Sequence, residues 1–223
     1  FNSEGNNNGQ GGNSNTVQES STTVEQDIKN FINYGFYFHN DLPDPKTERK
    51  TASEPFNYWY DQYVALENSS YQTQAPSKVY LTADDEFEKG GIPNFFSQVV
   101  KGNFDQIKTD LLSKIDEAIV KLNGKVTINL TGSASAPNTP EYNVNLSQRR
   151  VDSVIQWFDQ QKTSDEKTFG QYRTGGDPKL IFTIDFSGET ISIPKAATVV
   201  DENNPFSKNA AESNISSSVD CTI

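Results

Sequence analysis

Apolar residues recur at helical spacing across one long stretch near the middle of the chain. They fall at steps of three and four residues: Phe104, Ile107, Leu111, Ile115, Ile119 and Leu122. This spacing places them along one face of an α-helix, with charged residues opposite. The pattern predicts a helix over residues 93–122 that ends at Asn123 and Gly124, because glycine readily adopts the left-handed conformation found at helix ends.

Apolar and polar residues alternate, or aromatic residues cluster, in several shorter segments, and both patterns are typical of β-strands. The predicted strands and extended segments are 35–41, 126–130, 180–186, 191–193 and 219–223. Ser187 to Glu189 is expected to turn, because serine and glycine favour turns.

A second main helix is expected after the strand at 126–130. Asn145 or Ser147 is placed to cap its start, since short polar side chains accept hydrogen bonds from the first free N–H groups. Its buried stripe consists of Val151, Val154, Ile155 and Phe158. The stretches 132–142 and 162–178 are expected to be loops.

Residues 44–92 are polar overall but carry aromatic residues at Tyr58, Trp59, Tyr60 and Tyr63. The residues at helical spacing are Phe56, Tyr60, Tyr63 and Val64. The spacing fits one amphipathic helix, and linkers rarely hold so many aromatic residues. We therefore expect an ordered insertion whose aromatic residues form a small hydrophobic core, the alternative being a sugar-stacking platform. Residues 24–33 fit a short helix or an extended lead-in equally well.

The order of these elements predicts an α+β fold. A split βαβ sandwich satisfies it, with a mixed sheet of about four strands and the two main helices on one face. Residues 1–23 are almost all Asn, Gly, Ser, Gln and Thr, and such a segment buries too little apolar surface to fold. The expected organisation is a disordered linker over 1–23 and one domain over 24–223, with an insertion at about 44–92.

The charge balance excludes several classes of function. The 19 basic and 30 acidic residues give a net charge of −11, which repels the phosphates of nucleic acids.

No apolar run approaches the roughly 18 residues that span a membrane, so no direct membrane insertion is expected. The chain has no methionine and begins with Phe1, so we expect a fragment or processed product of a longer chain.

The sequence shows no recognised catalytic, metal-binding or phosphate-binding motif. The single histidine, His39, has no cysteine or histidine companions for a metal site, and the single cysteine, Cys221, is expected to be a small hydrophobic residue on a strand. Neither a Gly-x-Ser-x-Gly motif nor a phosphate-binding glycine loop occurs. The chain is therefore expected to be non-enzymatic, without a cofactor or a metal.

One motif in the region of the second main helix resembles the OmpA-like, peptidoglycan-associating domain family. That family shows Asn, two spacers, Leu-Ser, two spacers, Arg-Ala, two spacers and Val. The same spacing is occupied here, with valine instead of alanine after the arginine, by Asn143, Leu146, Ser147, Arg150 and Val154. Residues 36–43 also resemble the end of the family's first strand. The resemblance implies the OmpA-C-like version of the predicted sandwich.

The resemblance implies a site that holds the peptide stem of peptidoglycan without cutting it. In the family, an arginine grips a carboxylate of the diamino acid and a loop aspartate takes the amine. Arg150 stands at the arginine position, whereas Ser135 stands at the aspartate position and cannot neutralise an ammonium group. The set of ligand-binding residues implied by the resemblance is Arg150, Asn143, Ser135, Asn40 and Asp41.

Asn143 of this set and the neighbouring Arg149 also have other expected roles. Arg149 is expected on the surface, and the amide of Asn143 is expected to tie the preceding loop to the helix start.

Two functions follow as hypotheses. The first is attachment of a larger assembly to cell-wall peptidoglycan, in the periplasm or at the outer membrane. The second is a degenerate OmpA-like domain that packs against neighbouring protein subunits of an envelope complex, a contractile or secretion machine, or a virion. The serine at position 135 favours the second hypothesis, because losing a charge-assisted hydrogen bond costs about 1.5–3 kcal/mol.

Overall fold

The computed structural model describes residues 23–29, 34–39, 41–67, 95–134, 138–189 and 214–222 of this chain. The predicted linker falls almost entirely on residues outside these ranges, as do the extended segment at 191–193 and the part of the predicted insertion beyond residue 67. Within the described ranges, Val24 and Ile28 are buried on a helix over 23–29, which decides between the two expectations for that segment.

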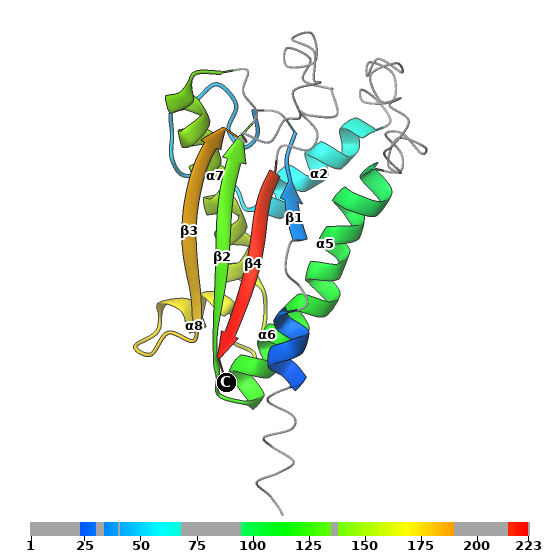
Figure 1. Ribbon diagram of the computed structural model, residues 1–223, viewed down its shortest axis with the longest axis vertical. Helices are drawn as coiled ribbons and strands as arrows, with labels where there is room; N and C mark the ends of the chain where they lie inside the picture. Colours follow the sequence, from blue (N-terminus) through cyan, green and yellow to red (C-terminus); the bar gives the residue numbers. More distant parts are fainter. Residues whose placement is uncertain are drawn as a thin grey trace, which may run out of the picture.

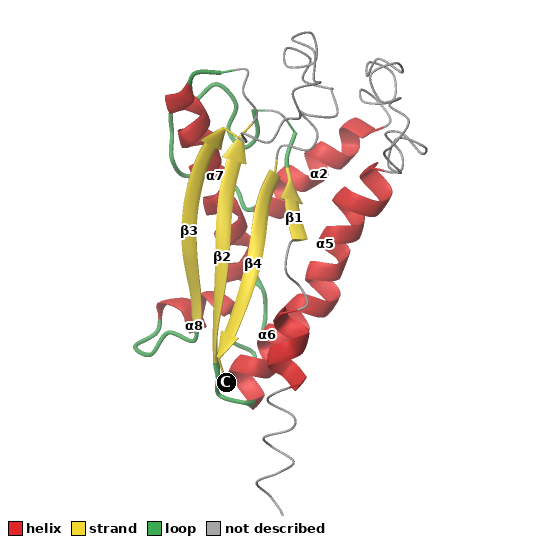
Figure 2. Ribbon diagram, in the orientation of Figure 1, coloured by secondary structure: helices red, strands yellow, loops and turns green. Residues whose placement is uncertain are grey.

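Four strands form one mixed sheet in the order β1-β4-β2-β3 (Figure 2). They are β1 (Tyr34–Tyr37), β2 (Lys125–Ala134), β3 (Leu180–Glu189) and β4 (Asn214–Thr222). β2 and β3 run parallel, and β4 is antiparallel to both β1 and β2. Together with the helices, this sheet confirms the predicted α+β class.

A long helical stretch covers residues 95–121, close to the predicted bounds. It alternates π-helical and α-helical turns without interruption: η2 (Phe95–Lys101), α5 (Gly102–Gln106), η3 (Ile107–Leu111), α6 (Leu112–Asp116) and η4 (Glu117–Lys121). Two further helices, α2 (Phe56–Leu66) and α7 (Pro140–Gln160), complete the layer against the sheet. Figure 1 shows α7 behind β2 and β3, α5 beside β1, and α6 lower down, near the C-terminal end of β4.

One hydrophobic core joins the sheet to these helices. β2 buries Val126, Ile128 and Leu130 on the face that meets the helices, as the alternating pattern predicts. Two aromatic residues of α2, Phe56 and Trp59, belong to this main core, and the ring of Phe56 lies 5.0 Å from the rings of Phe36 and Phe104, edge to face. Tyr63 instead packs with Phe96 and Val100 in a separate small cluster. The expected separate small core is therefore present around Tyr63, whereas the expectation was wrong for Trp59, which lies in the main core.

Several predicted boundaries were wrong, and a missed capping signal explains the first two of those below. α7 begins at Pro140 instead of near Ser147, because Thr139 caps it by accepting a hydrogen bond from the N–H of Tyr142. A short helix, α8 (Phe169–Thr174), interrupts the predicted loop at 162–178, and Thr168 opens it with a reciprocal capping box. The predicted turn at 187–189 is the last part of β3. β4 also begins earlier than predicted, at Asn214 instead of Val219.

Candidate functional site at the start of α7

A close approach of β2 to α7 brings together the segments that carry the candidate residues. A Cβ atom added to Gly132 on β2 would lie 2.6 Å from the carbonyl oxygen of Ser147 and 2.9 Å from Cγ2 of Val151. Only glycine allows this approach. It places the first half of α7 against the end of β2.

Arg150 lies at this junction and is fully buried. Its Nε donates to the carbonyl oxygen of Leu42 at 2.9 Å, and its Nη1 donates to that of Ser133 at 2.8 Å. A longer hydrogen bond of 3.4 Å joins Nη2 to the carbonyl oxygen of His39, and the guanidinium lies over the ring of Phe38. Arg150 therefore binds main-chain carbonyl groups of two segments far apart in the sequence.

Arg149 is also fully buried, so its expected place on the surface was wrong. Its Nε donates to the carbonyl oxygen of Pro43 at 3.1 Å, and its Nη1 donates to those of Thr47 and Arg49 at 2.8 and 2.6 Å. The guanidinium also lies over the ring of Tyr142. The side chain is buried because the segment after β1 folds over it and offers oxygen acceptors.

That segment, residues 41–54, is defined here as the arginine-held loop. Its near end is fixed by Asp41, which accepts hydrogen bonds from the hydroxyl of Tyr142 and from the N–H of Lys46. Asp41 and Lys46 both have left-handed backbone conformations, with φ of 62° and 59°. Residues other than glycine rarely adopt this conformation. The loop thus holds one specific conformation through contacts with α7.

The far end of the arginine-held loop is fixed in the same way. Asp44 accepts hydrogen bonds from the N–H and the hydroxyl of Ser53. On α7, Asp152 accepts from the N–H of Ala52 at 2.8 Å, and Gln156 donates to the carbonyl oxygen of Ala52 at 3.0 Å. The loop is therefore attached to α7 at several points between Tyr142 and Gln156.

The surroundings of His39 and Tyr142 disfavour the charged form of each side chain. Burial and the nearby Arg150 lower the pKa of His39 to about 4, although Asp41 opposes the shift. Burial and the hydrogen bond to Asp41 raise the pKa of Tyr142. Both side chains are therefore neutral at pH 7.

The remaining residues of the implied set are placed as follows. Asn143 is buried on α7, and its amide donates to the carbonyl oxygen of Asn138, which ties the preceding loop to the helix as predicted. Ser135 and Asn40 lie outside the described residues. Their ligand-binding roles, and that of Arg150, stay predictions.

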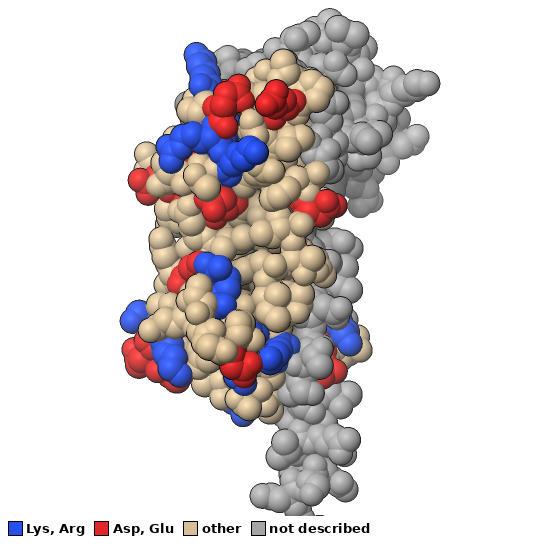
Figure 3. All heavy atoms as spheres, turned by 90° about the vertical axis from the view of Figure 1, so that its left-hand side faces the viewer, with Lys and Arg blue, Asp and Glu red and all other residues tan. Residues whose placement is uncertain are grey.

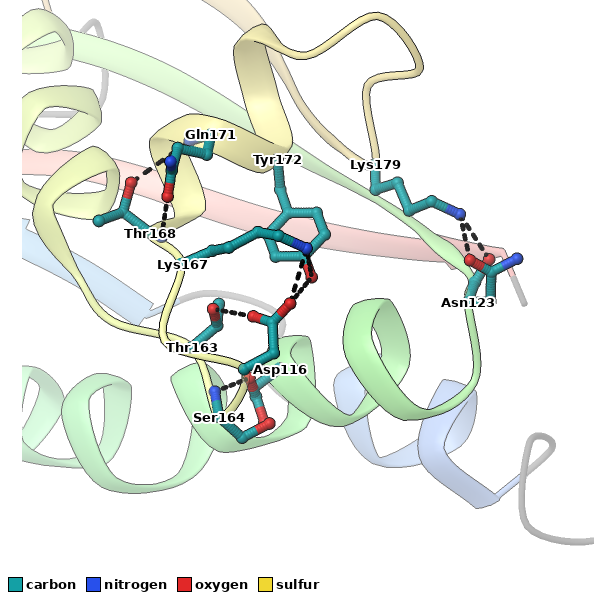
Figure 4. Close-up of polar contacts among 10 residues, drawn as sticks. Asp116, Asn123, Thr163, Ser164, Lys167, Thr168, Gln171, Tyr172 and Lys179 are labelled. Carbon is teal, nitrogen blue, oxygen red and sulfur yellow. Dashed lines mark hydrogen bonds and ion pairs between the residues drawn. The ribbon is translucent and has the colours of Figure 1, made fainter.

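A second polar cluster lies at the other end of the sheet, around α8 (Figure 4). Asp165 accepts hydrogen bonds from Thr163, Lys167 and Tyr172, and these lower its pKa. Ser164 donates its N–H to Asp116 of α6. Because the acceptors and donors of this cluster satisfy one another, it ties the segment between α7 and α8 to its neighbours.

No group of three or more His, Cys, Asp or Glu residues is arranged to hold a metal ion among the residues that the structure describes. In the same residues, no helix combines the length and the apolar character that crossing a membrane requires.

The sequence analysis missed Arg149 and Tyr142 as parts of this site. No local signal could have found them, because their partners lie about a hundred positions away in the chain. Comparison with protein-family models, with curated proteins and with solved structures finds no match to this chain.

Proposed function

We propose that this chain is a non-catalytic OmpA-like module that serves as a protein–protein building block of a larger assembly. The observation that supports this proposal is the complete burial of Arg149 and Arg150, whose guanidinium groups hold the chain's own carbonyl oxygens. In this arrangement the arginines order a surface loop, which then presents a fixed shape to neighbouring subunits. The parent assembly is an envelope complex, a contractile machine or a virion.

The cost of freeing Arg150 favours this role over ligand capture. A ligand carboxylate that recruited its guanidinium would leave the carbonyl groups of Leu42 and Ser133 without their donor. Each buried polar group left unpaired costs about 1–3 kcal/mol. At position 135 the chain also lacks the acid that would bind the amine of the ligand.

Attachment to peptidoglycan is the second candidate function, with a periplasmic or outer-membrane-associated location. One contact favours it: Arg150 lies 2.8 Å from the carbonyl oxygen of Ser133, two positions before Ser135. The family's binding mode requires a guanidinium close in the chain fold to the residue that takes the amine, and a planar guanidinium binds a carboxylate through two parallel hydrogen bonds.

Co-sedimentation with purified peptidoglycan sacculi, combined with thermal unfolding, separates the two candidates. The proteins are the wild type, Arg150→Ala, Ser135→Asp and the control Arg173→Ala, which removes a half-exposed arginine paired with Asp159. The building-block proposal expects no sedimentation of the wild type. It also expects a stability loss of about 2–6 kcal/mol for Arg150→Ala against about 0–1 kcal/mol for Arg173→Ala.

The opposite pattern would establish attachment. In that case the wild type sediments with sacculi, Arg150→Ala folds but does not sediment, and Ser135→Asp sediments more strongly because it restores the anionic partner of the amine.

A further inference from the structure

The strand β3 lies at one edge of the sheet, and β2 is the only described strand that pairs with it. Five large apolar side chains are exposed in the described part of the chain, and three of them belong to β3. These three are Ile181, Ile184 and Phe186, each between 37% and 42% exposed. A long edge strand with exposed apolar side chains is a template for pairing with another strand.

A groove of about 490 Å³ lies against β3 and is lined by its apolar side chains and by Ile155 of α7. The two cations in its lining, Lys125 and Arg173, are paired with Asp177 and Asp159. Figure 3 faces the side on which β3 lies in Figure 1 and shows charged side chains toward the upper and lower ends, with a band of uncharged atoms between them. The groove therefore suits an apolar strand better than a charged ligand.

The main chain of β3 directs hydrogen-bonding groups to the open edge at alternate residues. The carbonyl oxygen of Lys179 accepts a hydrogen bond of 2.8 Å from the N–H of Val126 on β2. Successive residues of a strand point their N–H and C=O groups to opposite sides. Those of Leu180, Phe182 and Ile184 therefore face away from β2, where no described strand meets them.

We infer that β3 pairs with β3 of a second copy of this chain, antiparallel and across a twofold axis at Phe182. In this register Lys179 lies opposite Asp185 of the other copy, and the symmetry forms this contact twice. Leu180 lies opposite Ile184, and Phe182 lies opposite its own counterpart. Side chains directly opposite each other in an antiparallel pair lie on the same face of the sheet, so charges meet charges and apolar residues meet apolar residues.

The order of charges along β3 selects this register. The neighbouring registers that keep the hydrogen bonds place Lys179 opposite Thr183 or Ser187, and both charge contacts are lost. Among the described residues no ion pair involves Lys179 or Asp185. Lys179 instead donates to Asn123 at an exposed position, as Figure 4 shows. Its charge is therefore still available to a carboxylate of a second copy.

Two terms keep the expected dimer weak. One pair of edge strands buries less area than a standard interface, and a net charge of −11 on each copy opposes association. Physiological salt screens the second term beyond about 8 Å. The inference deepens the proposed building-block function, on which it rests, by naming a second copy of the chain as the partner.

Sedimentation velocity of the full chain at physiological ionic strength, from micromolar to submillimolar concentration, tests the pairing. The variants Lys179→Glu and Asp185→Lys each set like charges opposite each other twice, so we expect each alone to dimerise roughly 5- to 100-fold more weakly than the wild type. An equimolar mixture of the two restores both contacts between unlike copies, and we expect it to form a dimer of wild-type affinity.

Matched controls separate these contacts from the overall charge. Lys121→Glu and Asp110→Lys make the same charge changes at exposed positions outside β3, and we expect them to shift the dimerisation constant by less than about 2-fold. Ile184→Pro removes an N–H that faces the open edge and leaves the hydrogen bonds to β2 in place, so we expect it to fold and stay monomeric. Circular dichroism checks the folding of each variant.

Three results would overturn the inference. They are a wild type that stays monomeric at every concentration, a mixture of the two charge variants that does not associate, and a folded Ile184→Pro variant that still dimerises. The first would assign the edge to another segment or another protein, and the other two would place the dimer contact elsewhere. A monomeric wild type leaves the sacculus and stability results standing, so the two proposals fail separately.

Discussion

Substitution of Gly132 by alanine tests the close approach on which the whole site depends. The added Cβ would lie 2.6 Å from the carbonyl oxygen of Ser147 and 2.9 Å from Cγ2 of Val151, both closer than the 3.0 Å that Cβ atoms keep. The oxygen belongs to the backbone of α7, so relief requires the helix and the strand to separate. Overpacking of this kind costs about 1–3 kcal/mol, and more where the backbone itself must move.

A smaller gain opposes this cost. Replacing glycine by alanine restricts the unfolded chain and stabilises the protein by about 0.4–1 kcal/mol. The expected net loss for Gly132→Ala is therefore about 2 kcal/mol, which corresponds to a fall in Tm of about 4–8 °C for a domain of this size. The matched control is Gly176→Ala, where an added Cβ meets no atom within 4 Å.

Urea unfolding followed by tryptophan fluorescence measures both variants, and the free energy of unfolding comes from linear extrapolation. Gly176→Ala is expected to unfold within about 1 kcal/mol of the wild type. If Gly132→Ala unfolds at the same urea concentration as Gly176→Ala, then β2 and α7 do not meet as described. The placement of Arg150 against the end of β2 would then also be wrong.

Two further predictions concern the neutral groups beside the arginine pair. The pKa of His39 in the folded protein, about 4, lies below its ordinary value of 6.5. Between these two pH values the unfolded chain binds more protons than the folded one. The free energy of unfolding therefore falls as the pH drops from about 6.5 to about 4. NMR titration of the single histidine should give the lowered pKa, and an ordinary pKa would contradict the burial of the ring. The loss in the free energy of unfolding on acidification, at most about 3 kcal/mol, should be smaller in His39→Gln. Tyr142→Phe removes the hydroxyl that joins Asp41 to Lys46, so we expect a loss of about 1–3 kcal/mol by chemical denaturation. An unchanged unfolding midpoint would show that the hydroxyl does not hold the loop.

Elements with a long repeating pattern could be predicted from the sequence. The apolar stripe at 104–122 and the alternation at 126–130 report which side of each element faces the core, and burial of Ile107, Ile115, Val126 and Ile128 agrees with them. Such patterns are local consequences of helix and strand geometry. The motif around Arg150 likewise located the helix on which it lies, although not the first residue of that helix.

Short signals were present in the sequence but were outweighed. Thr139 followed by Pro140 is a good helix start, and Thr168 with Gln171 forms the capping box of α8. Polar composition around them favoured loops instead. A helix of six residues is too short to show a helical repeat of apolar residues, so only its capping residues could have predicted it.

The sequence by itself determined the α+β class, the long helices and the pattern of buried strand positions, because these depend on residues a few positions apart. Only the tertiary structure decided that Arg149 and Arg150 are buried and that residues 41–54 form an ordered loop. Each of these features depends on carbonyl oxygens and carboxylates that folding brings together from segments about a hundred residues apart. No pattern among neighbouring residues encodes a contact of that range.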